Sequence, residues 1–91
     1  MPEIHLRIVG KVQGVGFRWF VREKALELGV AGWVRNTRSG DVELAASGAG
    51  ALLDHLVSAV SGGPQGAIVR AVHREPITAG ESYPSPFTIE A

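Results

Sequence analysis

Three glycines and one arginine stand close together in residues 10–18, GKVQGVGFR. The segment follows an alternating apolar run and precedes a helical pattern, which predicts a loop from a strand into a helix. Backbone N–H groups at a helix N-terminus lack intrahelical acceptors and attract anions. Gly14 and Gly16 allow the amides to form a concave nest, and Arg18 adds a planar fork that suits a phosphoryl group. These residue types therefore favour a phosphate-binding loop.

The common phosphate-binding motifs do not match this loop. Trp19 stands where a GxGxxG motif starting at Gly14 needs its third glycine, and GxxxxGK[ST] does not occur. A phosphatase with a cysteine nucleophile needs that cysteine six positions before Arg18, where this chain has Val12. If the loop serves phosphoryl transfer, water is therefore the expected nucleophile. The alternative is a plain strand-to-helix connection with a solvated arginine.

Asn36, within GWVRNTRSG, is the second candidate site residue. It shares strand parity with Val34, which assigns it to the core face of the predicted sheet, on the side of the glycine loop. Its side-chain amide can accept a hydrogen bond from water and donate one to a phosphoryl oxygen. The ordinary alternative is a local turn contact, which asparagine often makes near the end of a strand.

Neither GKVQGVGFR nor GWVRNTRSG contains His, Asp or Glu. A general acid or base therefore has no local source. An alkoxide leaving group needs such an acid, whereas a carboxylate, with a pKa of about 4, leaves without one. The two segments therefore favour an acyl phosphate as the substrate.

Strand and helix periods alternate along the chain in the order β, α, β, β, α, β. The predicted strands are 3–10, 30–38, 41–47 and 67–75, and the predicted helices are 17–28 and 49–61. Ser39 and Gly40 predict a tight hairpin turn, and Val69 and Val72 break the alternation in a way that suggests a bulge. Residues 87–91, FTIEA, are expected to form a short edge strand.

This order predicts one domain over residues 1–91, with an α/β fold of the α+β sandwich type. The βαββαβ arrangement is that of a ferredoxin-like fold, in which two helices cover one face of an antiparallel sheet. Because that fold carries many functions, the function has to be argued from the site.

The composition excludes several classes of protein. Nine basic residues balance nine acidic ones and there is no cysteine, so neither a nucleic-acid footprint nor a thiolate metal site is expected. No secretory signal and no apolar stretch of about 20 residues occurs, so we expect a cytoplasmic protein without a membrane partner. His5, His55 and His73 lack ligand spacing, so no metal is expected. Trp19 and Trp33 are expected to be packing residues or partly exposed aromatic surface.

The segment GKVQGVGFR, followed fourteen residues later by GWVRNTRSGDV and then Gly48, resembles the two signature segments of the acylphosphatases. The likeness continues weakly through GGPQGAIVRAV to Phe87 and Ile89 and covers nearly the whole chain. The resemblance implies a ferredoxin-like fold and hydrolysis of acyl phosphates to a carboxylate and inorganic phosphate, without metal or organic cofactor. It implies two catalytic residues, a phosphate-binding Arg18 and a water-orienting Asn36. The implied phosphate-binding amides belong to Gln13, Gly14, Val15, Gly16, Phe17 and Arg18.

The expected protein is a monomer that acts on a small-molecule acyl phosphate. The main alternative on the same fold is a non-catalytic module that binds phosphate or an acyl phosphate, and another is one domain of a larger carbamoyl-transfer enzyme. An RNA-binding version of the fold is disfavoured because DVELAAS has no aromatic residue and the chain is neutral. A metal-carrying version would need a CxxC motif.

Overall fold

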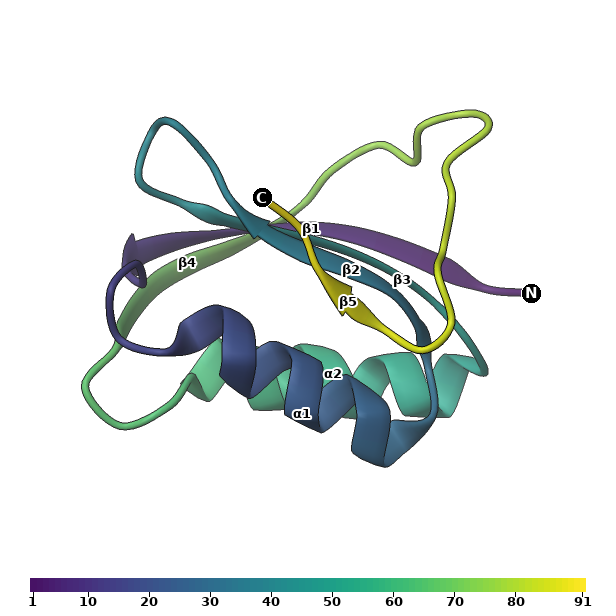
Figure 1. The fold of residues 1–91 in the computed structure, drawn as a ribbon, viewed down its shortest axis with the longest axis horizontal. Helices are drawn as coiled ribbons and strands as arrows, with labels where there is room; N and C mark the ends of the chain where they lie inside the picture. Colours follow the sequence, from purple (N-terminus) through teal and green to yellow (C-terminus); the bar gives the residue numbers. More distant parts are fainter.

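The computed structural model describes residues 1–91 as one sheet with a pair of helices on one of its faces (Figure 1). The strands are β1 (Glu3–Lys11), β2 (Ala31–Asn36), β3 (Val42–Ser47), β4 (Ile68–Arg74) and β5 (Thr88–Ile89). The helices are α1 (Phe17–Leu28) and α2 (Gly50–Gly62). The predicted order of elements is confirmed, and each end lies within two residues of its predicted place. No helix is long and apolar enough to cross a lipid bilayer.

The strand order across the sheet is β4-β1-β3-β2-β5. The four longer strands pair antiparallel, as predicted, with β1 between β3 and β4. The short β5 adds a parallel pair, in which Val34 of β2 lies opposite Ile89. The sheet is therefore mixed at this one edge. In the β2–β3 hairpin the N–H of Thr37 donates to the carbonyl of Asp41 at 2.9 Å, so the turn is one residue longer than predicted.

The core lies between the sheet and the helices. One face of the strands and one stripe of each helix are buried there, because apolar residues recur at the period of each element. The fully buried residues of the strands include Leu6, Ile8, Val34, Val42 and Leu44, and those of the helices include Val21, Ala25, Leu56 and Val60. This packing places the N-terminus of α1 over the end of β2 that carries Asn36 (Figure 1).

Gly10, the first glycine of the loop segment, belongs to β1 and marks a close approach of two strands. Val9 lies opposite Ala71 and Gly10 opposite Val69, so Arg70 is an extra residue on β4, as the broken alternation predicted. Gly10 has φ +142°, and a Cβ atom there would lie 2.0 Å from the carbonyl oxygen of β4 that precedes Val69. Glycine is therefore required for strand packing immediately before the loop begins.

The face of the sheet without helices carries a polar network around Glu43. One carboxylate oxygen lies 2.6 Å from His5 Nε2, and the other accepts a hydrogen bond from Arg35 Nε at 2.8 Å. Burial raises the pKa of Glu43, but the bonds from His5 and Arg35 outweigh it and hold that pKa below its ordinary value. Trp33 is 4% exposed beneath Arg35 and donates to Glu81 at 2.9 Å, which confirms its packing role.

Candidate active site

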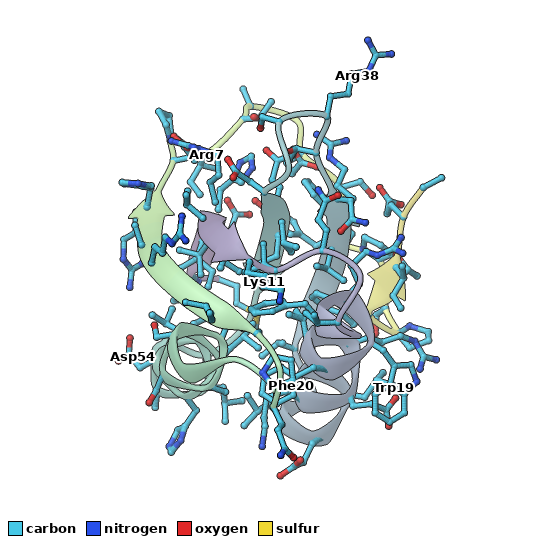
Figure 2. All side chains as sticks on the ribbon, turned by 90° about the vertical axis from the view of Figure 1, so that its left-hand side faces the viewer. Arg7, Lys11, Trp19, Phe20, Arg38 and Asp54 are labelled. Atoms are coloured by element: carbon cyan, nitrogen blue, oxygen red, sulfur yellow. The ribbon has the colours of Figure 1, made fainter.

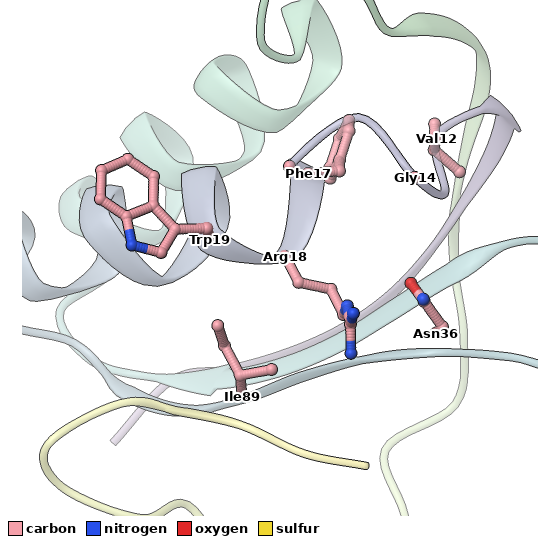
Figure 3. A pocket seen from close by; sticks show the side chains of 8 residues that line it. Val12, Gly14, Phe17, Arg18, Trp19, Asn36 and Ile89 are labelled. Carbon is pink, nitrogen blue, oxygen red and sulfur yellow. The ribbon is translucent and has the colours of Figure 1, made fainter.

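A hollow of about 200 Å³ opens where the glycine loop meets the end of β2 (Figure 3). Its lining comes from three parts of the chain, which are the loop with the first turn of α1, the end of β2, and β5. The lining residues are Val12, Gly14, Gly16, Phe17, Arg18, Trp19, Asn36 and Ile89. The two side chains singled out from the sequence, Arg18 and Asn36, therefore lie in the same hollow.

The loop owes its curvature to two glycines. Gly14 has φ 75° and Gly16 has φ 74°, both in the left-handed region that other residues adopt at a cost. A Cβ atom at either position would meet nothing within 4 Å, so backbone conformation rather than lack of space requires glycine here. Gly16 is also the N-cap of α1, and no side chain caps that helix end.

The amides of this loop are not used by the protein itself. No backbone hydrogen bond is donated by residues 13–19, and the first one in α1 runs from Phe20 N–H to the carbonyl of Gly16 at 3.0 Å. The first turn of α1 also contains no acidic residue. A run of free N–H groups at the positive end of a helix dipole favours a bound anion.

The positive charge of Arg18 is not compensated by any carboxylate. Its side chain extends from the first turn of α1 toward Asn36 (Figure 3). By contrast, Arg7, Arg22 and Arg35 each form an ion pair with a carboxylate. No Asp, Glu or His lines the hollow. The site can therefore attract an anion and polarise it, but it offers no side-chain acid or base.

Gln13 has a structural role that the sequence analysis missed. Its Nε2 donates to the carbonyl oxygens of Thr37 at 2.9 Å and Asp41 at 2.8 Å, and so ties the loop to the β2–β3 hairpin beside Asn36. The sequence shows a side chain with two donors but not the acceptors, which come from distant residues. The side chains of Gln13 and Val15, whose amides were predicted to bind phosphate, do not line the hollow.

We expect Gln13→Ala to lower the free energy of unfolding by about 1–2 kcal/mol, because two hydrogen bonds are lost together. Urea unfolding followed by circular dichroism measures this change. The matched control is Gln65→Ala, because Gln65 is exposed and makes no side-chain hydrogen bond, so we expect less than about 0.5 kcal/mol there. Equal stability of the two alanine variants would show that Gln13 does not tie the loop to the hairpin.

Comparison with known proteins agrees with the resemblance of the two segments to those of the acylphosphatases. The acylphosphatase family profile matches residues 4–89 of this chain. An acylphosphatase of Rhizobium etli is 42% identical over 86 residues, which cover 94% of this chain and 90% of that protein. A solved acylphosphatase from Coxiella burnetii has a TM-score of 0.85 and 42% identity, with 97% of this chain and 90% of that one covered. The crystal structure of acylphosphatase from Bacillus subtilis has a TM-score of 0.84 and 34% identity over the full length of both chains.

Proposed function

This chain belongs to the acylphosphatase family of acyl phosphate hydrolases, and on that premise we propose how its residues perform the reaction. The loop amides of residues 13–18 and the side chain of Arg18 bind the phosphoryl group, and Asn36 orients the attacking water. The observation that carries this proposal is that one hollow combines an uncompensated arginine, an asparagine and free amides while its lining contains no acid or base.

The loop and Arg18 act on the charge of the transition state. Phosphoryl transfer passes through a loose transition state with negative charge spread over the equatorial oxygens. Donors that are already in place stabilise this charge without reorganising as it develops. The glycines hold the amides in a curve, and Arg18 adds a guanidinium fork that can contact two phosphoryl oxygens. Binding and rate therefore depend on the same groups.

Asn36 acts on the nucleophile. Its Oδ1 accepts a hydrogen bond from the water, and its Nδ2 donates to a phosphoryl oxygen. The water oxygen bonds to phosphorus, and the bond from phosphorus to the acyl oxygen breaks, with the electron pair leaving on the carboxylate. One water proton passes to a phosphoryl oxygen, because the lining holds no carboxylate or imidazole to accept it. The products are a carboxylate and dihydrogen phosphate.

We also propose that the reaction needs no metal or organic cofactor. The lining offers no carboxylate, imidazole or thiolate ligand, and Arg18 with the amides supplies the positive charge. We propose that the protein acts as a monomer, because the loop amides, Arg18 and Asn36 already meet within one folded domain. The balanced charge supports a small-molecule substrate rather than a nucleic acid, and the lack of cysteine fits the cytoplasm.

Hydrolysis of benzoyl phosphate in the presence of EDTA tests this proposal. We expect turnover well above the rate in buffer alone, and we expect the Arg18→Ala variant to lose most of it. Release of inorganic phosphate provides a second readout. If the protein binds phosphate in a calorimeter but shows no turnover, it is a binding module of the same fold. If EDTA abolishes turnover, the reaction depends on a metal.

A further inference from the structure

The hollow has an apolar wall that a phosphoryl group does not need. Of its larger apolar side chains, Val12 and Phe17 are each 1% exposed and belong to the core. Trp19 is 61% exposed and Ile89 is 39% exposed, so both present apolar surface to solvent beside the anion site. Exposed apolar side chains next to a few polar groups suit a ligand with an anionic head and an apolar body.

This wall lies on the side of Arg18 that faces away from Asn36 (Figure 3). Figure 3 shows Trp19 and Asn36 on opposite sides of Arg18, with Ile89 below the space between Trp19 and Arg18. In phosphoryl transfer the attacking and leaving oxygens are roughly in line, on opposite sides of phosphorus. A phosphoryl group bound beside Arg18, with the water held at Asn36, would therefore direct its acyl group toward Trp19 and Ile89. Figure 2 gives a second view, in which Trp19 projects from the outer side of α1.

Resting on the proposed function, we propose that Trp19 and Ile89 form the subsite for the acyl group. The chain then prefers acyl phosphates whose acyl group is apolar, above all aromatic, over those with a very small acyl group. An aromatic acyl group packs against the indole ring of Trp19, and the side chain of Ile89 in β5 bounds the subsite on another side. The two residues determine specificity and leave the binding of the phosphoryl group to the loop and Arg18.

A second hollow, of about 500 Å³, is the competing place for the acyl group, and it is less suitable. It shares Asn36 with the first hollow and therefore lies on the side of the attacking water. Of its two arginines, Arg35 is already paired with Glu43 at 2.8 Å. The other, Arg38, lies at the tip of the β2–β3 hairpin and points away from the rest of the molecule (Figure 2). A charged acyl group therefore finds no comparable subsite.

Steady-state kinetics with benzoyl phosphate and acetyl phosphate test the subsite, because the two substrates share the phosphoryl group and differ in the acyl group. We expect Trp19→Ala to lower the ratio of kcat/KM for benzoyl phosphate over acetyl phosphate by about tenfold, through a higher KM for benzoyl phosphate. Trp19→Phe keeps an aromatic ring, so we expect its ratio to stay within about threefold of wild type. Inhibition by inorganic phosphate should not change in either variant.

The matched control is Leu26→Ala, because Leu26 is an exposed apolar residue on the same helix, 37% exposed, that does not line the hollow. Its substrate ratio should equal that of wild type. An unchanged ratio in Trp19→Ala, or an equal loss with both substrates, would overturn the subsite while leaving the proposed function intact. A wild-type protein that hydrolyses neither substrate would instead overturn the proposed function, and the subsite with it.

Discussion

Arg18→Ala is expected to lower kcat/KM for benzoyl phosphate by about 10³-fold, a larger effect than we expect from Asn36→Ala or Trp19→Ala. Arg18 carries the one positive side chain among the residues that line the hollow, and no carboxylate neutralises it. Its removal takes away charge that stabilises both the bound phosphoryl group and the more negative transition state. Both kcat and KM should therefore worsen, and inorganic phosphate should inhibit more weakly.

Two further variants separate charge from geometry. Arg18→Lys keeps the positive charge but loses the planar fork, so we expect about a tenth to a hundredth of wild-type activity. Arg22→Ala removes an arginine one turn further along α1 that is paired with Glu23 at 3.0 Å and does not line the hollow. It should retain activity within about twofold of wild type, since exposed pairs contribute little. An Arg18→Ala enzyme within tenfold of wild type would contradict the assignment.

Asn36→Ala is expected to lower kcat by about 10²-fold, while KM and phosphate inhibition change much less because only one of several donors to the phosphoryl group is lost. By the proposed mechanism, the loop and Arg18 would still bind the phosphoryl group in this variant, but the water would no longer be held in line with the leaving carboxylate. Single-turnover measurements with benzoyl phosphate separate this loss in the chemical step from any change in binding. Full turnover by Asn36→Ala would show that another group positions the water.

Asn36→Asp provides a sharper comparison at the same position. The side chain keeps its size and one acceptor for water, but it introduces a negative charge beside the phosphoryl group and loses the amide donor. We therefore expect weaker phosphate inhibition in Asn36→Asp than in Asn36→Ala. The control is Ser39→Ala at the exposed hairpin turn, outside the hollow, for which activity should stay within about twofold.

Much of the fold could be predicted because its signals are local. Alternation in residues 3–10 and helical spacing from Phe17 report directly which face of each element is buried. Glycine and proline mark where elements end, so the element order and the hairpin follow from neighbouring residues. The placement of Arg18 and Asn36 on one side of the sheet could also be predicted, because strand parity and a helix start indicate the side on which each residue lies.

What sequence alone determined is therefore the order of the elements, the face of each strand and the candidate residues of the loop, since these depend on residues a few positions apart. Tertiary structure alone decided which distant groups meet. The side chain of Gln13 finds its acceptors across the loop and hairpin, and Ile89 reaches the hollow only because β5 pairs parallel with β2. Periodicity shows whether a residue is buried or exposed. It does not show which distant residue lies beside it, because strand pairing is set by the packing of the whole chain. For that reason the exposed wall of Trp19 and Ile89 became visible only in the folded molecule.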